Sequence, residues 1–242
     1  MDVALTAVAV GGMALVASTI AAVAGFGGAV IMLPVLIWAV GVRDAIPILT
    51  LSQLLSNVSR VWFNRGELSV PVIGWFALGA APSAVLGGVV FATAPAAALV
   101  RGLGVFLLTL VAYRRSPWGK QMTISLRGFL PLGVASGLMS SLLGVVGPFM
   151  APFFLAYGLV KGAYIGTEAL ATVVMHVTKL GVYGMYSLLD NRTLLLGLSI
   201  GAVSFLGSYL GKRILGRVPD RMFPRIIEGI LIVAGLMLLI MG

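Results

Sequence analysis

Polar side chains recur along one apolar stretch of the sequence, residues 163–187. Successive members are three or four residues apart, a spacing that places side chains on one face of an α-helix. They are Glu168, Thr172, His176 and Lys179. A charge inside a membrane helix is costly and marks a functional site by default. We expect Glu168 to carry a proton that His176, which titrates near physiological pH, can share, and Lys179 to attract an anion.

The same row also has a structural interpretation. Glu168 and Lys179 could form an ion pair bridged by His176, or Lys179 could extend along the helix to the membrane surface. His176 is the only histidine of the sequence, which excludes a metal site built from several histidines. We expect neither a metal nor another cofactor.

A second polar row lies in the apolar stretch 44–63. Its members are Thr50, Gln53, Asn57 and Arg60. Apart from Arg60, at the inner end, these are uncharged hydrogen-bond donors and acceptors that could replace water around a polar solute. The alternative is hydrogen bonding between helices, which such residues commonly make in membranes. We expect Thr50, Gln53 and Asn57 to contact the solute.

A glycine-rich motif interrupts apolar sequence twice, at residues 24–34 (AGFGGAVIMLP) and 143–152 (LGVVGPFMAP). In lipid, broken backbone survives only where protein or a polar cavity satisfies it, and paired breaks in two halves point to a transport site. A helix that begins after such a break presents free N–H groups and the positive end of its dipole to an anion. The residues expected to bind it are Gly25, Phe26, Gly27, Gly28, Gly144 and Gly147.

Prolines accompany both motifs. Pro34 and Pro152 lie inside the short segments that follow, where each is expected to kink the helix. Pro148 removes one backbone donor directly after Gly147, which favours the first motif as the better anion cradle. The alternative for both motifs is close packing, because small residues line helix interfaces in membranes.

Composition places these motifs in a membrane protein. Of 242 residues, 60% are hydrophobic and 10% charged, with a mean hydropathy of +1.12, whereas a soluble domain is about 25% charged. The start of the chain lacks the basic region of a cleavable signal, and the absence of cysteine excludes disulfides and thiol catalysis. The net charge of +9 could suggest nucleic acid, but the basic residues lie between apolar segments and are better explained by membrane topology, so we expect no nucleic-acid partner.

The apolar segments form two similar series. Matching positions include Pro34 with Pro152, Thr50 with Thr167, and Gly87 with Gly211, which indicates a duplication; we expect Thr167 to contact the solute as Thr50 does. The expected domains are an N-terminal repeat (1–115), a linker (116–127) and a C-terminal repeat (128–242). The expected segments are 3–24, 27–41, 44–63, 70–92 and 95–113, then 128–143, 147–159, 163–187, 193–211 and 226–241.

The loop charges predict opposite orientations for the two repeats. The segment after each glycine motif is too short for a full span, so each half crosses an odd number of times. With the central loop 114–127 in the cytoplasm, only Arg43 and Arg192 of the 16 basic residues lie outside, while Arg101 and Lys179 fall within segments. We therefore expect an all-α polytopic membrane protein of two inverted-topology repeats with broken or re-entrant helices.

These motifs resemble the sulfite exporter TauE/SafE family of small bacterial membrane permeases. The resemblance is carried by GFGGAVIMLPVL (25–36) with Thr50, and by GVVGPFMAPFFLAYGL (144–159) with GTEAL (166–170). It spans nearly the whole chain, although Pro148 departs from the adjacent glycines of the family's second motif. The resemblance implies export of sulfite or a small organosulfonate, coupled to an ion gradient, from the bacterial inner membrane.

The sequence thus favours a secondary transporter, with no enzymatic activity, for a small anion such as sulfite or a sulfonate. Its expected partners are that anion, membrane lipid and a coupling proton or other ion, with the oligomeric state left open. A passive channel or nonenzymatic membrane subunit is the alternative. A membrane hydrolase is disfavoured, because the sequence has a single histidine and no Gly-x-Ser-x-Gly elbow.

Overall fold

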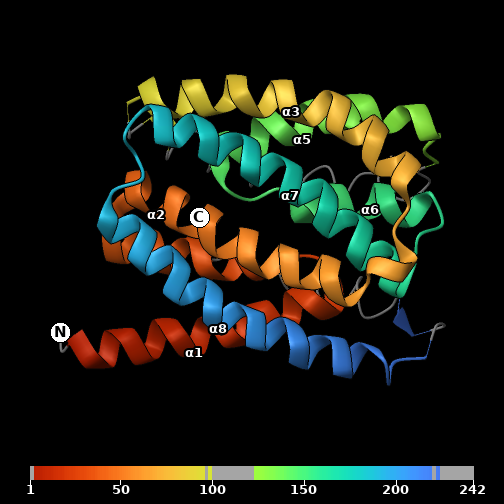
Figure 1. Cartoon of the computed structure of the whole chain (residues 1–242), viewed down its shortest axis with the longest axis horizontal. Coiled ribbons are helices and arrows are strands. Elements are labelled where there is room, and N and C mark those ends of the chain that lie inside the picture. The colour runs from red at the N-terminus through yellow and green to blue at the C-terminus, as the bar shows by residue number, and fades with distance from the viewer. Residues whose placement is uncertain (1–2, 96–97, 100–122, 220–221, 224–242) are drawn as a thin grey trace.

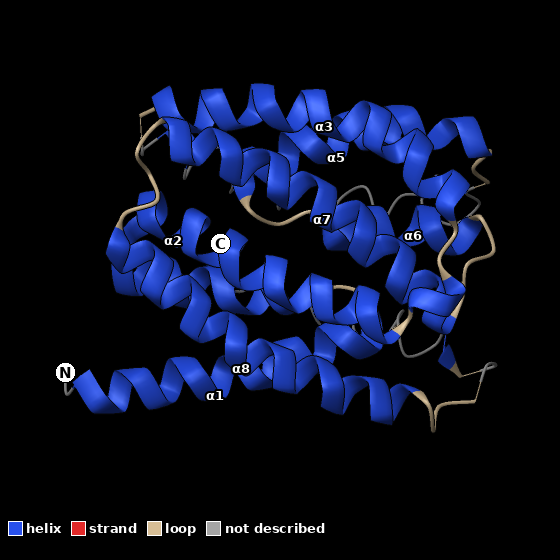
Figure 2. Cartoon of the chain, in the orientation of Figure 1, coloured by secondary structure: helices blue, strands red, loops and turns tan. Residues whose placement is uncertain are grey.

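The expected apolar segments form helices. The computed structural model describes residues 3–95, 98–99, 123–219 and 222–223, and within these the regular structure is entirely helical (Figure 2). The expected segments 95–113 and 226–241, like most of the predicted linker, lie largely outside the described residues. The helices are α1 (Val3–Ala24), α2 (Gly28–Phe63), η1 (Arg65–Glu67), α3 (Val70–Thr93), η3 (Leu126–Gly128), α5 (Phe129–Leu143), α6 (Gly147–Ala156), α7 (Lys161–Met185) and α8 (Asn191–Leu215).

Helix α2 reverses direction at Gly41. This glycine has φ 78° and ψ 163°, which is non-helical backbone inside an otherwise helical segment. In a straight helix Gly28 and Gln53 would lie about 37 Å apart. Instead, a methyl group added at Gly28 would lie 2.8 Å from the Gln53 Nε2 atom. The arms of this hairpin, 28–40 and 42–63, correspond to two of the expected segments.

The second half reverses in the same way between α5 and α6. Gly144 ends α5 with φ 73°, and α6 begins at Gly147. The ring of Phe154, near the end of α6, lies 5.1 Å from that of Phe129 at the start of α5. Helix α6 therefore runs back along α5, and both glycine motifs are breaks between helices.

The helices form two groups of three, stacked in Figure 1 as an upper and a lower layer. Helices α3, α5 and α7 make one group, and α1, α2 and α8 make the other. The groups meet mainly where α2 packs against α7. Each group takes two of its helices from one half of the sequence and one helix from the other half.

Helices within a group run in the same direction, where α2 is represented by its second arm, 42–63. Along α3 and α5, Gly79 faces Val134 and Gly87 faces Leu138. Along α1 and α8, the residue pairs are Leu15 with Gly207 and Thr19 with Gly211. Along α2 and α8 they are Leu51 with Gly197 and Leu55 with Gly201, and along α3 and α7 they are Ser69 with Thr167 and Gly88 with Val182.

The two groups run in opposite directions. Across their interface Asn64 faces Gly166 and, further back along α2, Arg60 faces Glu168, so rising numbers on α7 meet falling numbers on α2. Helices α1, α2 and α3 therefore point opposite to α5, α7 and α8, respectively, the helices that the predicted duplication would match with them. The duplication itself stays a prediction.

Glycines permit the closest helix contacts in both groups. A methyl group added at Gly87 would lie 2.8 Å from the Leu138 carbonyl oxygen of α5, and one added at Gly211 would lie 2.6 Å from the Thr19 carbonyl oxygen of α1. Small residues allow this approach between membrane helices. The two glycines that match in sequence thus each lie at a close contact between parallel helices.

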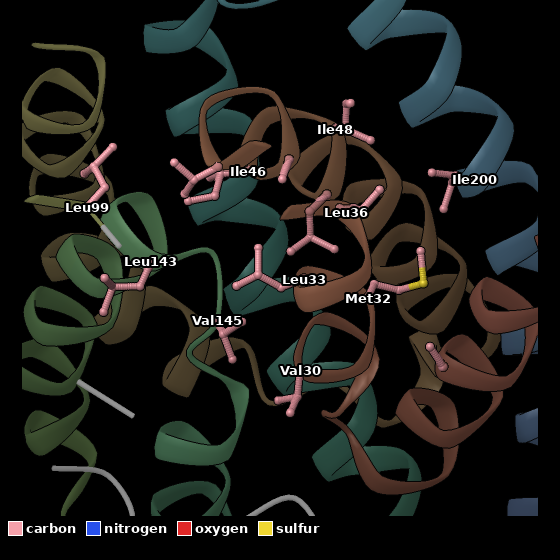
Figure 3. Packing of buried hydrophobic residues seen from close by; sticks show 14 of the residues in the cluster. Val30, Met32, Leu33, Leu36, Ile46, Ile48, Leu99, Leu143, Val145 and Ile200 are labelled. Carbon is pink, nitrogen blue, oxygen red and sulfur yellow. The ribbon is translucent and has the colours of Figure 1, made fainter. Parts of the chain in front are cut away.

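One of two apolar core clusters surrounds the hairpin of α2 (Figure 3). Leu33 and Leu36 from the first arm and Ile46 from the second belong to this cluster, together with Val145 of the second break. By length and apolarity, four helices of the described chain could cross a membrane, in the ranges Gly28–Phe63, Val70–Thr93, Leu126–Leu143 and Asn191–Leu215. Helix α7, whose row of polar residues lowers its hydropathy, is not among them.

Candidate functional site

A pocket lies where the two breaks meet, between α2 and α7. It holds about 440 Å³ of space not filled by atoms, open solvent included. Ten of the expected site residues line it: Gly25, Phe26, Gly27, Gly28, Gln53, Asn57, Gly144, Gly147, Glu168 and His176. The lining also includes Arg60, Ser140, Pro148 and Thr172.

The two breaks touch each other at the pocket. A methyl group added at Gly147 would lie 2.6 Å from the Phe26 Cβ atom, so only glycine fits there without a shift. Gly27, the residue before α2, has φ 107°, a left-handed conformation that glycine adopts without strain. Helices α2 and α6 both begin at the pocket, and the first N–H groups of a helix lack partners within it. Two helix N-termini therefore point their positive ends toward one space.

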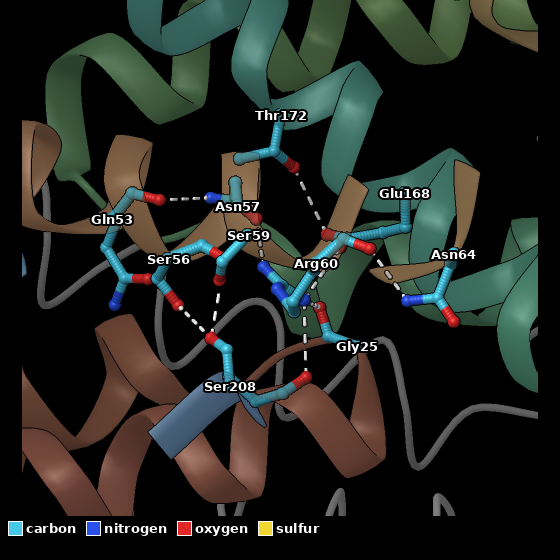
Figure 4. A network of polar contacts seen from close by, with 11 residues as sticks. Gly25, Gln53, Ser56, Asn57, Ser59, Arg60, Asn64, Glu168, Thr172 and Ser208 are labelled. Atoms are coloured by element: carbon cyan, nitrogen blue, oxygen red, sulfur yellow. Dashed lines mark hydrogen bonds and ion pairs between the residues drawn. The ribbon is translucent and has the colours of Figure 1, made fainter. Parts of the chain in front are cut away.

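Arg60 supplies the cation of the pocket, although its side chain is only 4% exposed. Its Nη1 atom donates to the carbonyl oxygens of Ala21 (3.2 Å) and Gly25 (2.7 Å), at the end of α1. Its Nη2 atom donates to the side-chain oxygen of Asn57 (Figure 4). The guanidinium thus binds the Gly25 carbonyl oxygen at the break and adds a second hydrogen bond to the Ala21 carbonyl oxygen, which also accepts from the Gly25 N–H.

Glu168 provides the counter-charge of Arg60. Its Oε2 atom lies 3.4 Å from the Arg60 Nη1 atom, and its Oε1 atom accepts a hydrogen bond of 3.2 Å from Thr172 (Figure 4). Both charged side chains are buried, and a buried ion pair is tolerated only when its charges are paired and hydrogen-bonded. The pair joins α2 to α7 across the interface of the two groups.

Two buried nitrogens at the pocket lack a hydrogen-bond partner. They are Arg60 Nε and His176 Nδ1. His176 is only 4% exposed and lines the pocket. Because buried polar atoms are normally paired, such atoms beside a pocket indicate a ligand or water that completes them.

Lys179 caps the second break. Its side chain is fully buried, and its Nζ atom donates to the carbonyl oxygen (3.0 Å) and the hydroxyl oxygen (3.1 Å) of Ser140, near the end of α5. Glu168 is paired with Arg60, so the alternative ion pair of Glu168 with Lys179 is not formed. Burial likewise excludes the alternative in which Lys179 extends to the membrane surface.

Three expected site residues lie outside the pocket lining. The Thr50 hydroxyl donates to the Ile46 carbonyl oxygen of its own helix (2.7 Å). The Thr167 hydroxyl accepts from the backbone N–H of Ser69 (3.0 Å) and so holds the start of α3. Lys179 reaches the pocket only through Ser140, which does line it. A contact of Thr50, Thr167 or Lys179 with the solute stays a prediction.

The counting of loop charges placed Arg60 among the cytoplasmic basic residues, and that side of the membrane stays a prediction, but Arg60 lies inside α2 and not in a loop. The side chain is buried and turns toward the end of α1 and Glu168. The sequence held a signal for this position, because Gln53, Asn57 and Arg60 share one helical face. Arg60, Ser140 and Thr172 are thus the polar pocket residues that were not among the expected site residues, although Arg60 and Thr172 belonged to the two polar rows.

The prolines occupy the expected helices. Pro34 lies inside α2 and Pro152 inside α6, but the non-helical backbone of α2 is at Gly41. A kink at either proline stays a prediction. Pro148 is in the first turn of α6, where the missing N–H would be free of an intrahelical partner in any case.

The C-terminal end of α2 is tied to α8. The Lys212 Nζ atom donates to the Asn64 Oδ1 atom (2.5 Å) and lies 3.8 Å from the Glu67 Oε1 atom. Asn64 in turn donates to the carbonyl oxygen of Arg60 (2.7 Å). Among the described residues, no group of three or more His, Cys, Asp or Glu side chains is placed to hold a metal ion.

Comparison with known proteins identifies the family. The sequence model of the family described as sulfite exporter TauE/SafE matches residues 10–238, nearly the entire chain and both breaks. No curated protein and no solved structure matches the chain. With both glycine motifs, the pocket between them and the helices that form it inside the match, the chain belongs to the sulfite exporter TauE/SafE family.

Proposed function

We propose that this member of an exporter family is a secondary transporter that carries sulfite or a small organosulfonate by alternating access. The observation that carries the proposal is the pocket where the starts of α2 and α6 meet beside Arg60. Helix N-termini and a guanidinium favour a small oxyanion, which accepts several hydrogen bonds at once. The anion sits against Gly25–Gly28 and Gly144–Gly147, with the Gln53 and Asn57 amides at its side.

The pocket gives further residues their roles in binding. The unpartnered His176 Nδ1 atom contacts the anion or shares the proton of Glu168. Lys179 acts through Ser140 and adds positive potential behind the second break. Thr50 and Thr167 act on the solute during the cycle. A proton accompanies transport through Glu168 and His176.

Alternating access comes from two inverted repeats. The opposite directions of the matched helices and the similar close contacts of Gly87 and Gly211 support this interpretation. The pocket lies at the interface of the two three-helix groups, so a rocking motion of one group against the other opens it to either side. The contacts of Lys212 with Asn64 and Glu67 close one end and must part for access from that side.

The chain lies in the bacterial inner membrane, with the central loop in the cytoplasm. Lys212, Asn64 and Glu67 lie together at one end of the helices, where the end of α2 meets the end of α8. Arg43, which donates to the Ala94 carbonyl oxygen (2.7 Å), lies at the end of α3, which points the opposite way. An excess of basic residues at the first end fits the cytoplasmic side.

Sulfite flux into proteoliposomes tests the function. The purified protein should accumulate sulfite against its gradient when an ion gradient is imposed, which a passive channel cannot do. In Gln53→Ala, which removes a pocket amide, the KM for sulfite should rise about tenfold, the effect of one hydrogen bond to a charged group. Ser59→Ala is the matched control, because Ser59 is buried in the same helix and bonds only the Ser56 carbonyl oxygen. Absence of sulfite flux in the wild type would overturn the proposal.

A further inference from the structure

We infer that the Glu168 carboxylate holds the place of the transported anion on Arg60, so that anion binding displaces Glu168 and adds a proton to it. This inference rests on the proposed function and specifies its coupling. In the empty site the carboxylate balances the guanidinium. In the loaded site the anion takes over that role, and Glu168 becomes a neutral carboxylic acid.

The geometry makes Glu168 the replaceable partner of Arg60. The Nη1 atom lies 2.7 Å from the Gly25 carbonyl oxygen, and the Nη2 atom bonds Asn57, so two of the three nitrogens hold the guanidinium in place. The contact with Glu168 is longer, at 3.4 Å. The Nε atom is buried without a partner, and Arg60 lines the pocket. An oxyanion can therefore bind Arg60 without disturbing the bonds that cap α1.

Among the acids of the described residues, only Glu168 pairs with Arg60. Arg60 is the one charged group that faces it from α2, and Tyr164, His176 and Lys179 are the titratable groups nearby on its own helix. The described parts of α1, α3, α5 and α6 contain no charged or titratable residue. The nearest acid of η1, Glu67, is half exposed and pairs with Lys212.

The desolvation cost of unpaired charges decides in which charge states the pocket can change the side of the membrane to which it is open. With the anion bound and Glu168 ionised, a carboxylate would stay buried without its partner. With Glu168 protonated and no anion, the guanidinium would be left unbalanced. Each state costs the desolvation of an unpaired charge. The two states without this cost are the empty site with its ion pair and the site that holds both anion and proton, so the two solutes cross together.

The proton that binds Glu168 is taken up on one side of the membrane and released on the other. It comes from water on the side to which the pocket is open, adds to a carboxylate oxygen of Glu168, and leaves when the anion is released on the other side. Linkage then makes the sulfite affinity fall about tenfold for each pH unit once the carboxyl group is ionised in the empty site. A monoanion crosses with no net charge, and a membrane potential does not drive it.

Calorimetry of sulfite binding to the purified protein tests this coupling. Titrations at one pH in two buffers of different ionisation enthalpy, neither containing a sulfonate, give the number of protons taken up per anion. Subtracting the value of Glu168→Gln removes the protons of sulfite itself, and the difference should be one. Glu168→Gln should bind sulfite at least as tightly as the wild type, with the steep loss of affinity at high pH abolished.

Two further measurements test the coupling without relying on Glu168→Gln. In the wild type, infrared difference spectra should show the carbonyl stretch of a protonated carboxylic acid when sulfite is added. Thr172→Val, which removes only the hydroxyl that holds Glu168, should retain the uptake of one proton. Equal proton uptake by wild type and Glu168→Gln, or no carboxylic acid band in the wild type, would overturn the inference and leave the transport function standing. A wild type that neither binds nor transports sulfite would instead overturn the proposed function.

Discussion

At both helix breaks a cationic side chain binds a carbonyl oxygen at the end of the helix, but the cation differs between the breaks. At each, a glycine with positive φ ends a helix, and its N–H donates to the carbonyl oxygen four residues earlier, Ala21 for Gly25 and Ser140 for Gly144. Each of these carbonyl oxygens also accepts from a cation of a distant helix. Arg60 reaches Ala21 at 3.2 Å, and Lys179 reaches Ser140 at 3.0 Å.

The partners of the two cations differ. Arg60 binds the end of α1, an amide and a carboxylate at once, and it lines the pocket. Lys179 binds only Ser140 among the described residues and is sealed from the pocket. A planar guanidinium with five donors can cap a helix and bind a ligand at the same time, whereas an ammonium group is a compact point charge. The cation at the first break therefore both caps a helix and lines the pocket, whereas the cation at the second break only caps a helix.

Removing the first cation should have the largest effect. Arg60→Met leaves Glu168 buried without its partner and should lower the free energy of unfolding by about 3–5 kcal/mol. Denaturant unfolding in detergent measures this, with Arg43→Met, an exposed cap on α3, as the control. The double variant with Glu168→Gln should recover most of the loss. Equal losses for Arg60→Met and Arg43→Met would contradict the special role of the first cap.

The two capping glycines should differ in their tolerance of alanine. Gly25→Ala and Gly144→Ala both place a side chain at positive φ, which costs about 1–2 kcal/mol. At Gly25 the new methyl group would also overlap the ring of Tyr164, whereas at Gly144 its nearest neighbour is Ile46 Cγ1 at 3.5 Å. Gly25→Ala should therefore unfold at lower denaturant than Gly144→Ala. The reverse order would mean that the second break is the tighter one.

Removing the second cation should matter less. Lys179→Met keeps a similar volume, and the Ser140 carbonyl oxygen retains its bond from the Gly144 N–H. The expected cost is about 1 kcal/mol, while sulfite affinity should fall several-fold because positive potential behind the pocket is lost. The unfolding assay and calorimetry on the same preparation measure both. If Lys179→Met unfolded as readily as Arg60→Met, the contrast between the two caps would fail.

The starts of helices α3 and α8 are held by different side chains, Thr167 and Asp190. Substitutions there should have the smallest effects on stability. Hydrogen bonds from the side chain and backbone of Thr193 hold the pKa of Asp190, which precedes α8, below its ordinary 3.8. A lowered folded pKa means that this stabilisation is present above pH 3.8 and is lost as the pH falls toward the folded value. Asp190→Ala should lower Tm slightly at neutral pH, with the difference from wild type vanishing in acid.

The control for the pH dependence of Asp190→Ala is Thr167→Val, which acts at the start of α3. It removes the bond from the Ser69 N–H to the Thr167 hydroxyl, which carries no titratable group. Its effect on Tm should not change with pH. A loss that tracked pH in the same way for both variants would show that the two helix starts depend on one shared group.

Local features were predictable from the sequence, and long-range contacts were not. The helix ends at Gly25 and Gly144 follow from glycines in apolar runs, which act locally. The expected segments that fall on described residues agree with the helices to within a few residues. The role of Arg60 depends on Glu168, 108 residues away, and was missed. The alternative in which Glu168 pairs with Lys179 on its own helix fails because tertiary packing places Arg60 beside Glu168.

The exchange of helices between the two groups has a consequence for biosynthesis. When the first half has left the ribosome, the glycine face of α3 has no α5 to receive it, and the side of α1 that contacts Gly207 and Gly211 still awaits α8. The first half must therefore stay in the membrane with the surface of α3 unfilled until α5 is made, and with that of α1 unfilled until α8 is made. A chain cut short before α8 would lose a third of the group that holds the first break.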